Sequence, residues 1–264
     1  MRIFLGLLIF ISQPSLGFEI PKGLTLSDRQ EVVRTMGMNS ATKALTNPYP
    51  LGGYSGFEVG VSVEFINVRD IQRLGCTPGS AGCANTMIQT ETEWRYSRLS
   101  IGKGLYDDLD IFFNFMLPVG AVRASDYGGM LRWSFYQARF LPINISAIVH
   151  ANQLNSGDTF INQNFGAEIM FGVNVDNFAL YFGGGQMQAY GTFTGALTAA
   201  TCQEDCTTTP GDHALNENSR TISERLNQSH MVVGLSMHFG NLFAAAQVDR
   251  YRDAVYGLKT GLHF

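Results

Sequence analysis

The chain is poor in charge, since Asp, Glu, Lys and Arg make up only 15% of its 264 residues, against about a quarter in soluble domains. The formal net charge of −4 provides no basic surface for nucleic acid. Aromatic residues make up 12%, which excludes a disordered chain, because such chains are highly charged and poor in aromatics. No run of about 18 apolar residues follows the N-terminus, so a helical membrane protein is excluded as well. What fills the sequence instead is 29 Gly, 19 Phe and 10 Tyr.

The first 17 residues have the three parts of a secretory signal peptide. Arg2 supplies the positive end, Ile3 to Ile11 form an apolar run, and Ser15 to Gly17 offer small residues for cleavage. This run is too short to cross a bilayer as a helix, which takes about 20 residues. A buried N-terminal helix is the alternative. We therefore predict a signal peptide over residues 1–17 and an exported mature chain from residue 18.

Export makes the four cysteines candidates for disulfides. They form two close pairs, Cys76/Cys83 and Cys202/Cys206, each in a stretch rich in small and polar residues. The spacing favours two local loops in an oxidising compartment. A metal site is the alternative, but neither pair has the C-x2-C spacing and only His213 lies near one of them. We expect neither a metal nor a cofactor.

Beyond residue 50, apolar residues alternate with small or polar ones, which is the pattern of β-strands with one apolar face. In segment 57–65, for example, Phe57 and Val59 lie on one face and Glu58 on the other. The clearest predicted strands are 57–65, 109–117, 165–173, 231–239 and 256–264. Weaker ones lie near 92–102, 129–138, 143–153, 178–188 and 242–251. The total is even, as a closed antiparallel barrel with both ends on one side requires.

Segment 92–102 does not follow the alternation cleanly. Leu99 and Ile101 favour one face as apolar, whereas Trp94 and Tyr96 lie on the other. A β-bulge between the two pairs would explain the change.

The face opposite the apolar one is rich in glycine and carries charges of both signs, which suits a barrel lumen of paired residues. The candidate lumen residues are Glu58, Glu64, Asp110, Arg132, Glu168, Asp249 and Lys259. Eight steps of about 3.3 Å, tilted by about 40°, rise roughly 20 Å, close to the apolar band of an outer-membrane barrel. A soluble β-sandwich would also alternate, but it would not need such a lumen or band.

The connections between the predicted strands alternate in length. Those after odd strands are long, near 67–91, 119–128, 154–162 and 190–223, and only the last, 252–253, is short. Those after even strands are tight, and they include Asp176-Asn177 and Gly240-Asn241. Long loops on one rim and short turns on the other are typical of bacterial barrels. We predict an all-β membrane protein, a closed antiparallel up-and-down transmembrane β-barrel of about ten strands over residues 55–264.

With its signal peptide and residues 55–264, the chain resembles the small bacterial outer-membrane β-barrel proteins of 8–10 strands. The most specific piece is the last strand, 254–264, in which Tyr256, Leu258, Leu262 and Phe264 alternate up to a terminal aromatic residue. The resemblance implies that this strand is the signal read by the outer-membrane assembly machinery. It also implies residence in the bacterial outer membrane, with membrane lipid as a partner. It does not indicate the oligomeric state. The family hosts pores, adhesins, proteases and lipid-modifying enzymes, so the fold does not select a function.

Residues 18–54 do not alternate. Ser27 with Gln30 reads as a capping box for a short helix that Gly37 could close. We predict a periplasmic N-terminal segment, which either folds into the lumen as a plug or lies as an arm under the barrel.

The favoured role is a narrow pore or a structural surface barrel, and we expect no enzymatic activity. An enzyme at the outer rim is the first alternative. Asp212-His213 invites comparison with omptin-like proteases, which use acidic residues and a histidine, but no second aspartate pair matches. Ser236 and His238 suggest a lipid hydrolase, although both face the lumen near the short turns. An adhesin or receptor acting through the disulfide-bearing loops is the second alternative.

Overall fold

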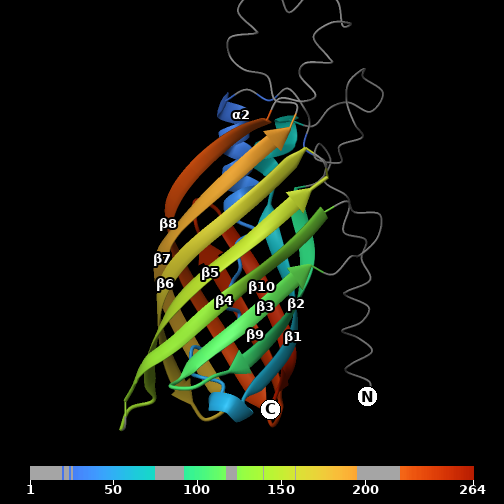
Figure 1. The fold of residues 1–264 in the computed structure, drawn as a ribbon. Helices are drawn as coiled ribbons and strands as arrows, with labels where there is room; N and C mark the ends of the chain where they lie inside the picture. The colour runs from blue at the N-terminus through green and yellow to red at the C-terminus, as the bar shows by residue number, and fades with distance from the viewer. Residues whose placement is uncertain are drawn as a thin grey trace, which may run out of the picture.

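The computed structural model describes residues 20, 24, 26–74, 92–116, 124–138, 140–157, 159–194 and 221–264. These residues form a closed barrel of ten strands, in which each strand pairs antiparallel with its sequence neighbours and β10 pairs with β1 (Figure 1). The predicted fold class is therefore confirmed. The strands are β1 (Phe57–Asn67), β2 (Glu93–Gly104), β3 (Leu109–Met116), β4 (Ala124–Gln137), β5 (Ile143–Ser156), β6 (Phe160–Val175), β7 (Phe178–Thr194), β8 (Thr221–Phe239), β9 (Leu242–Arg250) and β10 (Ala254–His263).

The barrel closes by the pairing of β1 with β10, which runs from Glu58 and His263 to Phe65 and Tyr256 and is extended by two hydrogen bonds at the end that carries the short turns. The amide of Phe57 donates to the carbonyl of Phe264 at 3.0 Å, and the reverse hydrogen bond measures 2.8 Å. Asp176 and Gly240, both with positive φ, lie in two of the tight turns at this rim. At the opposite rim, β5 and β6 continue further than predicted, so their connection is 157–159 rather than 154–162.

The alternation of the strands sorts their side chains as predicted, with the inner face buried and the outer face exposed. β2 is the instructive case, because Trp94 and Tyr96 point inward without any bulge, and their pairing with β1 is continuous. They face inward because the lumen near the rim of the long connections holds an apolar core, which the prediction of a polar lumen did not include. The register shift of the wall lies instead in β4, between Trp133 and Tyr136.

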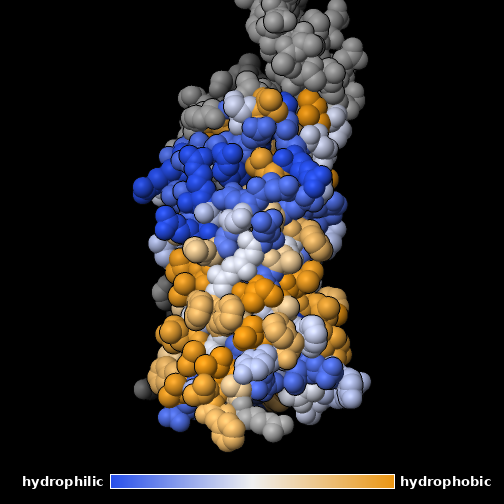
Figure 2. All heavy atoms as spheres, turned by 90° about the vertical axis from the view of Figure 1, so that its left-hand side faces the viewer, coloured by the Kyte–Doolittle hydropathy of each residue, from blue (hydrophilic) through white to orange (hydrophobic). Residues whose placement is uncertain are grey.

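The outer surface divides into an apolar belt near the short turns and a polar collar toward the other end. Figure 2 shows both zones on one face of the barrel. On β6–β8 the belt includes Phe165, Ile169, Phe171, Leu180, Phe182, Met231, Val233 and Leu235. The collar on the same strands includes Gln163, Gln186, Gln188, Thr192, Ser223, Arg225, Asn227 and Ser229. No helix among the described residues is long and apolar enough to cross a membrane.

The segment before the barrel lies inside it. It forms the helix α2 (Leu26–Val32) and a π-helical turn η1 (Val33–Met38), then runs in irregular conformation to the short helix η2 (Gly53–Ser55). Figure 1 shows α2 at the end opposite the C-terminus, over the rim to which β8 and η3 (Arg69–Leu74) also contribute. The assignment of residues 18–54 to the periplasm stays a prediction. Gly37 does not close the helix, because the helical turns continue to Met38.

Candidate functional site: the occupied lumen

The N-terminal segment contacts the inner wall along the whole length of the barrel. Its contacts progress in chain order from the rim of the long connections to the rim of the short turns. In the half nearer the long connections, Arg29 pairs with Glu224 at 2.9 Å. There the Gly37 carbonyl accepts a hydrogen bond from Asn164 at 2.7 Å, and the Ser40 carbonyl accepts one from Asn152 at 2.9 Å. In the half nearer the short turns, the Leu45 amide donates a hydrogen bond to Gln247 at 2.9 Å. The Pro48 carbonyl accepts one from Ser134 at 2.8 Å, and the Leu51 amide donates one to Asp110 at 3.1 Å.

At mid-height, a buried charge cluster joins the segment to β1, β2 and β4. Arg98 pairs with Glu64 at 2.9 Å and also with Asp126, and it donates to the carbonyls of Ser40 and Ala41. Lys43, from the segment, reaches the other oxygen of Glu64 at 2.6 Å. Because buried charges are stable only when they are paired and hydrogen-bonded, the segment completes a network that the wall does not complete alone.

Two further ion pairs lie nearer the short turns. Lys259 pairs with Glu58 at 2.7 Å, and Thr46 of the segment donates to the same carboxylate at 3.0 Å. Arg132 pairs with Asp110 at 2.8 Å and donates to the Asn47 carbonyl. In both cases a wall pair also binds the segment, so the wall charges hold the segment in place.

Glu168 of β6 lies between His150 of the adjacent strand β5 and His230 of β8, two strands away on the other side. The Nε2 atoms of His150 and His230 are 3.0 and 2.9 Å from the same Glu168 oxygen, and all three side chains are buried. The ring of Tyr251, from the β9–β10 connection, packs at 4.8 Å from His230. Burial raises the pKa of the Tyr251 hydroxyl well above its ordinary value. No group of three or more His, Cys, Asp or Glu among the described residues could hold a metal ion.

Two lumen glycines are required by the approach of the segment. A Cβ at Gly257 would lie 2.7 Å from Cδ2 of Leu45, and one at Gly172 would overlap the ring of Pro48. At both positions the atoms that a side chain would meet first all belong to the segment. Glycines on the inner face of a barrel can leave a narrow path, accommodate strand coiling or let another segment approach the wall. At Gly172 and Gly257 the structure has the approaching segment.

Apolar side chains fill much of the remaining lumen. Around α2 and η1, Val32, Val33 and Met36 pack with residues of the wall such as Trp94 and Phe160. A second cluster near the short turns includes Ala44 and Leu51 with Phe112, Met170 and Tyr181. The prediction of a polar lumen did not include these apolar clusters, although the inward parity of Trp94 and Tyr96 already indicated an apolar partner inside.

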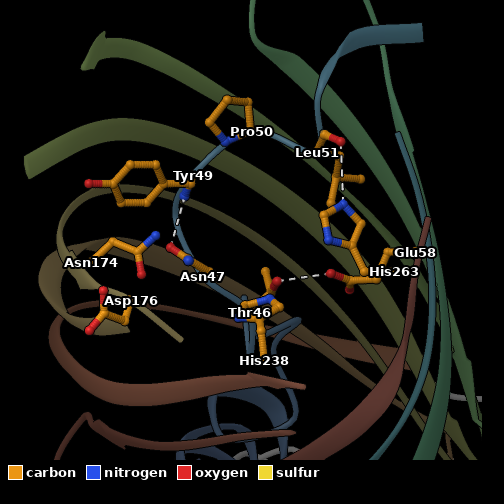
Figure 3. A pocket seen from close by; sticks show the side chains of 10 residues that line it. All are labelled: Thr46, Asn47, Tyr49, Pro50, Leu51, Glu58, Asn174, Asp176, His238 and His263. Atoms are coloured by element: carbon orange, nitrogen blue, oxygen red, sulfur yellow. Dashed lines mark hydrogen bonds between the residues drawn. The ribbon is translucent and has the colours of Figure 1, made fainter. Parts of the chain in front are cut away.

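A cavity of about 220 Å³ opens at the rim of the short turns. Figure 3 shows that the segment itself, from Thr46 to Leu51, forms one side of it. The Nε2 atom of His263 lies 3.3 Å from the carbonyl oxygen of Leu51. A second cavity, deeper in the lumen beside Lys43, measures only about 10 Å³.

The structure places all the predicted lumen charges inside the barrel and buried: Glu58, Glu64, Asp110, Arg132, Glu168, Asp249 and Lys259. Ser236 is buried, and its hydroxyl makes no hydrogen bond with any described residue, His238 included. Tyr256, Leu258 and Phe264 of the terminal strand are exposed on the outer face, and Leu262 is half-buried. Cys76, Cys83, Cys202, Cys206, Asp212 and His213 lie outside the described residues.

No known protein-family profile matches the chain, and no curated protein matches it. Several solved structures resemble it weakly. The N-terminal β-barrel domain of Pseudomonas aeruginosa OprF has 11% identity and a TM-score of 0.35, over 80% of this chain and 99% of that one. The KdgM porin in complex with disordered oligogalacturonate has 12% identity and a TM-score of 0.37, over 78% and 99%. Ail, the attachment invasion locus protein of Yersinia pestis, has 10% identity and a TM-score of 0.30, over 79% and 98%.

Likeness at this level assigns neither a family nor a function, so the class of the protein rests on its own architecture. A closed antiparallel barrel with an apolar outer belt, paired charges on its inner face and short turns at one rim is the architecture of bacterial outer-membrane β-barrels. The protein is an outer-membrane β-barrel of the small kind. The segment from Val32 to Leu51 occupies the lumen of this barrel.

Proposed function

We propose that the protein is a structural outer-membrane barrel whose lumen is closed by its own N-terminal segment. The observation that carries this proposal is the position of residues 32–46, which are nearly all buried within the barrel and hydrogen-bonded to its wall. Ten strands enclose little free width even without a plug, since eight are filled by side chains and 16–18 are needed for an open aqueous channel.

A gated narrow pore is the second candidate. It is favoured by the wall behind the segment, which carries ion pairs and amides rather than a purely apolar core. Such a wall would be hydrated if the segment left, and the lumen would then offer ions a path lined by Glu58, Lys259 and Arg132. In the closed form, the segment occupies that path.

Assembly through the last strand, contact with membrane lipid and the absence of enzymatic activity are further proposals. Exposure of Tyr256, Leu258 and Phe264 on the last strand supports recognition by the outer-membrane assembly machinery, and the apolar belt supports membrane lipid as a partner. We also propose that the protein is not an enzyme. The burial of Ser236 supports this, because a nucleophile needs a base within hydrogen-bond reach and access to substrate. An adhesin role would depend on connections outside the described residues.

Conductance in a planar lipid bilayer tests the proposed closure. The refolded full-length chain is expected to give no discrete current steps. The double variant Gly172→Leu/Gly257→Leu places side chains where the atoms of Pro48 and Leu45 now lie, so it is expected to displace the segment, and discrete current steps from it would establish the gated pore. Gly129→Leu is the matched control, because Gly129 lies on the outer face, where a Cβ would meet nothing closer than 3.5 Å.

Each outcome has a distinct meaning once folding is shown by a heat-dependent gel shift. Steps from the unmodified chain would contradict a closed barrel. Silence from the folded double variant would exclude the gated pore and leave the structural barrel as the function.

A further inference from the structure

The direction in which the N-terminal segment passes through the barrel is fixed by its contacts at the two rims. Arg29 pairs with Glu224, which lies near the start of β8 and therefore at the rim of the long connections. Leu51 contacts Asp110 and His263, which lie at the start of β3 and the end of β10, at the rim of the short turns. The segment thus crosses the barrel from one rim to the other before β1 begins.

The chain is held at the far rim even before α2 begins. Ile20 and Leu24 are buried, and they belong to one apolar cluster with Ile66, Val68 and Ile71. Ile66 lies at the end of β1, and Ile71 lies in η3, which follows it. Residue 20 is therefore located at the rim of the long connections, the whole height of the barrel away from Phe57.

Two observations indicate which rim faces outward. The short turns of outer-membrane barrels face the periplasm and the longer connections face the exterior. The polar collar also lies on the side of the long connections, so β6–β8 project beyond the apolar belt there (Figure 2). The belt itself reaches the rim of the short turns, where Phe178 and Phe239 are exposed.

We infer that the chain is threaded through its own barrel, so that the part around Ile20 and α2 belongs to the cell surface and the segment runs inward from there to the periplasmic rim. This inference rests on the occupied lumen proposed above. The helix α2, in which Leu26 is 53% exposed, then lies at the cell surface beside the long connections. It is accessible to antibodies, proteases and extracellular partners, whereas a periplasmic arm would not be.

The threaded arrangement also limits how the lumen can open. The segment is continuous with β1 at the periplasmic rim, so it cannot leave outward as a whole. It can leave only by withdrawal toward the periplasm, which would draw the surface element around Ile20 and α2 into the barrel. Opening of the lumen and loss of the surface element are therefore one event.

Labelling of intact cells tests the inference on the full-length chain. A short epitope is inserted between Glu19 and Ile20 and probed with an antibody before and after the outer membrane is permeabilised. The same epitope in the 195–220 connection is the outward control, and in the Gly240-Asn241 turn it is the inward control. We expect the N-terminal epitope to be labelled on intact cells to the same extent as the outward control.

Labelling of the N-terminal epitope only after permeabilisation, with both controls as expected, would overturn the inference. Labelling of the Gly240-Asn241 epitope on intact cells would overturn it too, because the barrel would then be inverted. If the insertion prevents folding, Leu26→Cys and Asn241→Cys replace it, with a membrane-impermeant maleimide and peptide mapping as the readout. Leu26 is 53% exposed, so its cysteine is expected to react on intact cells and that at residue 241 is not.

The threading and the closure can fail separately. A silent bilayer recording together with a periplasmic epitope would overturn the direction of threading while the closed barrel stands. Current steps from the unmodified chain would instead contradict the closure itself.

Discussion

Replacing Arg98 by methionine is expected to lower the free energy of unfolding by about 3–5 kcal/mol, the cost of removing one partner from a buried ion pair. The side chains of Arg98, Glu64 and Asp126 are at most 3% exposed. Without the guanidinium, Asp126 keeps, among the described residues, the side-chain amide of Asn152 at 3.0 Å as its hydrogen-bond donor, and Glu64 keeps Lys43 and Tyr96. The carbonyls of Ser40 and Ala41 lose a donor as well, so the segment is loosened together with the wall.

Arg95→Met on the same strand is the matched control. Arg95 points outward and pairs with Glu93 at 3.0 Å, with side-chain exposures of 59% and 38%. An exposed pair of this kind contributes about 0–1 kcal/mol. Urea titration of the two refolded variants, followed by the heat-dependent gel shift, measures both changes. Equal destabilisation by the two substitutions would contradict the buried network.

An arginine at Val233 is expected to destabilise the barrel in a bilayer by about 2–4 kcal/mol, as a charge at the midplane of the lipid face does. Val233 is 55% exposed on the outer face of β8, between Met231 and Leu235 of the belt. In aqueous solution an exposed valine would tolerate this change. The size of the penalty therefore reports directly on the lipid that surrounds the belt.

Thr221→Arg serves as the control, because Thr221 lies at the collar end of β8, beyond the belt. A surface substitution there is expected to change the stability by no more than about 0.5 kcal/mol. Unfolding of both variants from vesicles of the same lipid gives the comparison. If arginine were tolerated equally at the two positions, the assignment of the belt would be wrong.

The sequence was sufficient to predict the barrel but not its contents. Alternation with period two depends only on each strand's own residues, so it places Glu58 and Glu64 on the inner face of β1 and Phe165 on the outer face of β6, where the structure has them. The partners of the lumen charges are not local. Lys259 and Glu58, for example, are 201 residues apart, and only the closure of the barrel brings them together.

The N-terminal segment was the hardest part to predict, because it has neither alternation nor a long helix. The positions of its apolar residues and of Lys43 depend on the wall residues that they contact. Leu45, for example, fills the space left by Gly257. One signal was present in the sequence: Trp94 and Tyr96 occupy the inner parity of β2, and large inward aromatics require something apolar inside the barrel. Attributing them to a bulge concealed that signal.

A disulfide between the segment and the wall is the most direct measurement of the occupied lumen. In the double variant Leu45→Cys/Gly257→Cys, the new sulfur at residue 45 takes the position of Leu45 Cγ, which is 3.4 Å from a Cβ at residue 257. This separation suits a disulfide. After oxidation in the outer membrane, peptide mass spectrometry is expected to find residues 45 and 257 linked, and the control Val33→Cys/Gly257→Cys unlinked. Absence of the 45–257 link from the folded, oxidised barrel would contradict the account that the N-terminal segment fills the lumen.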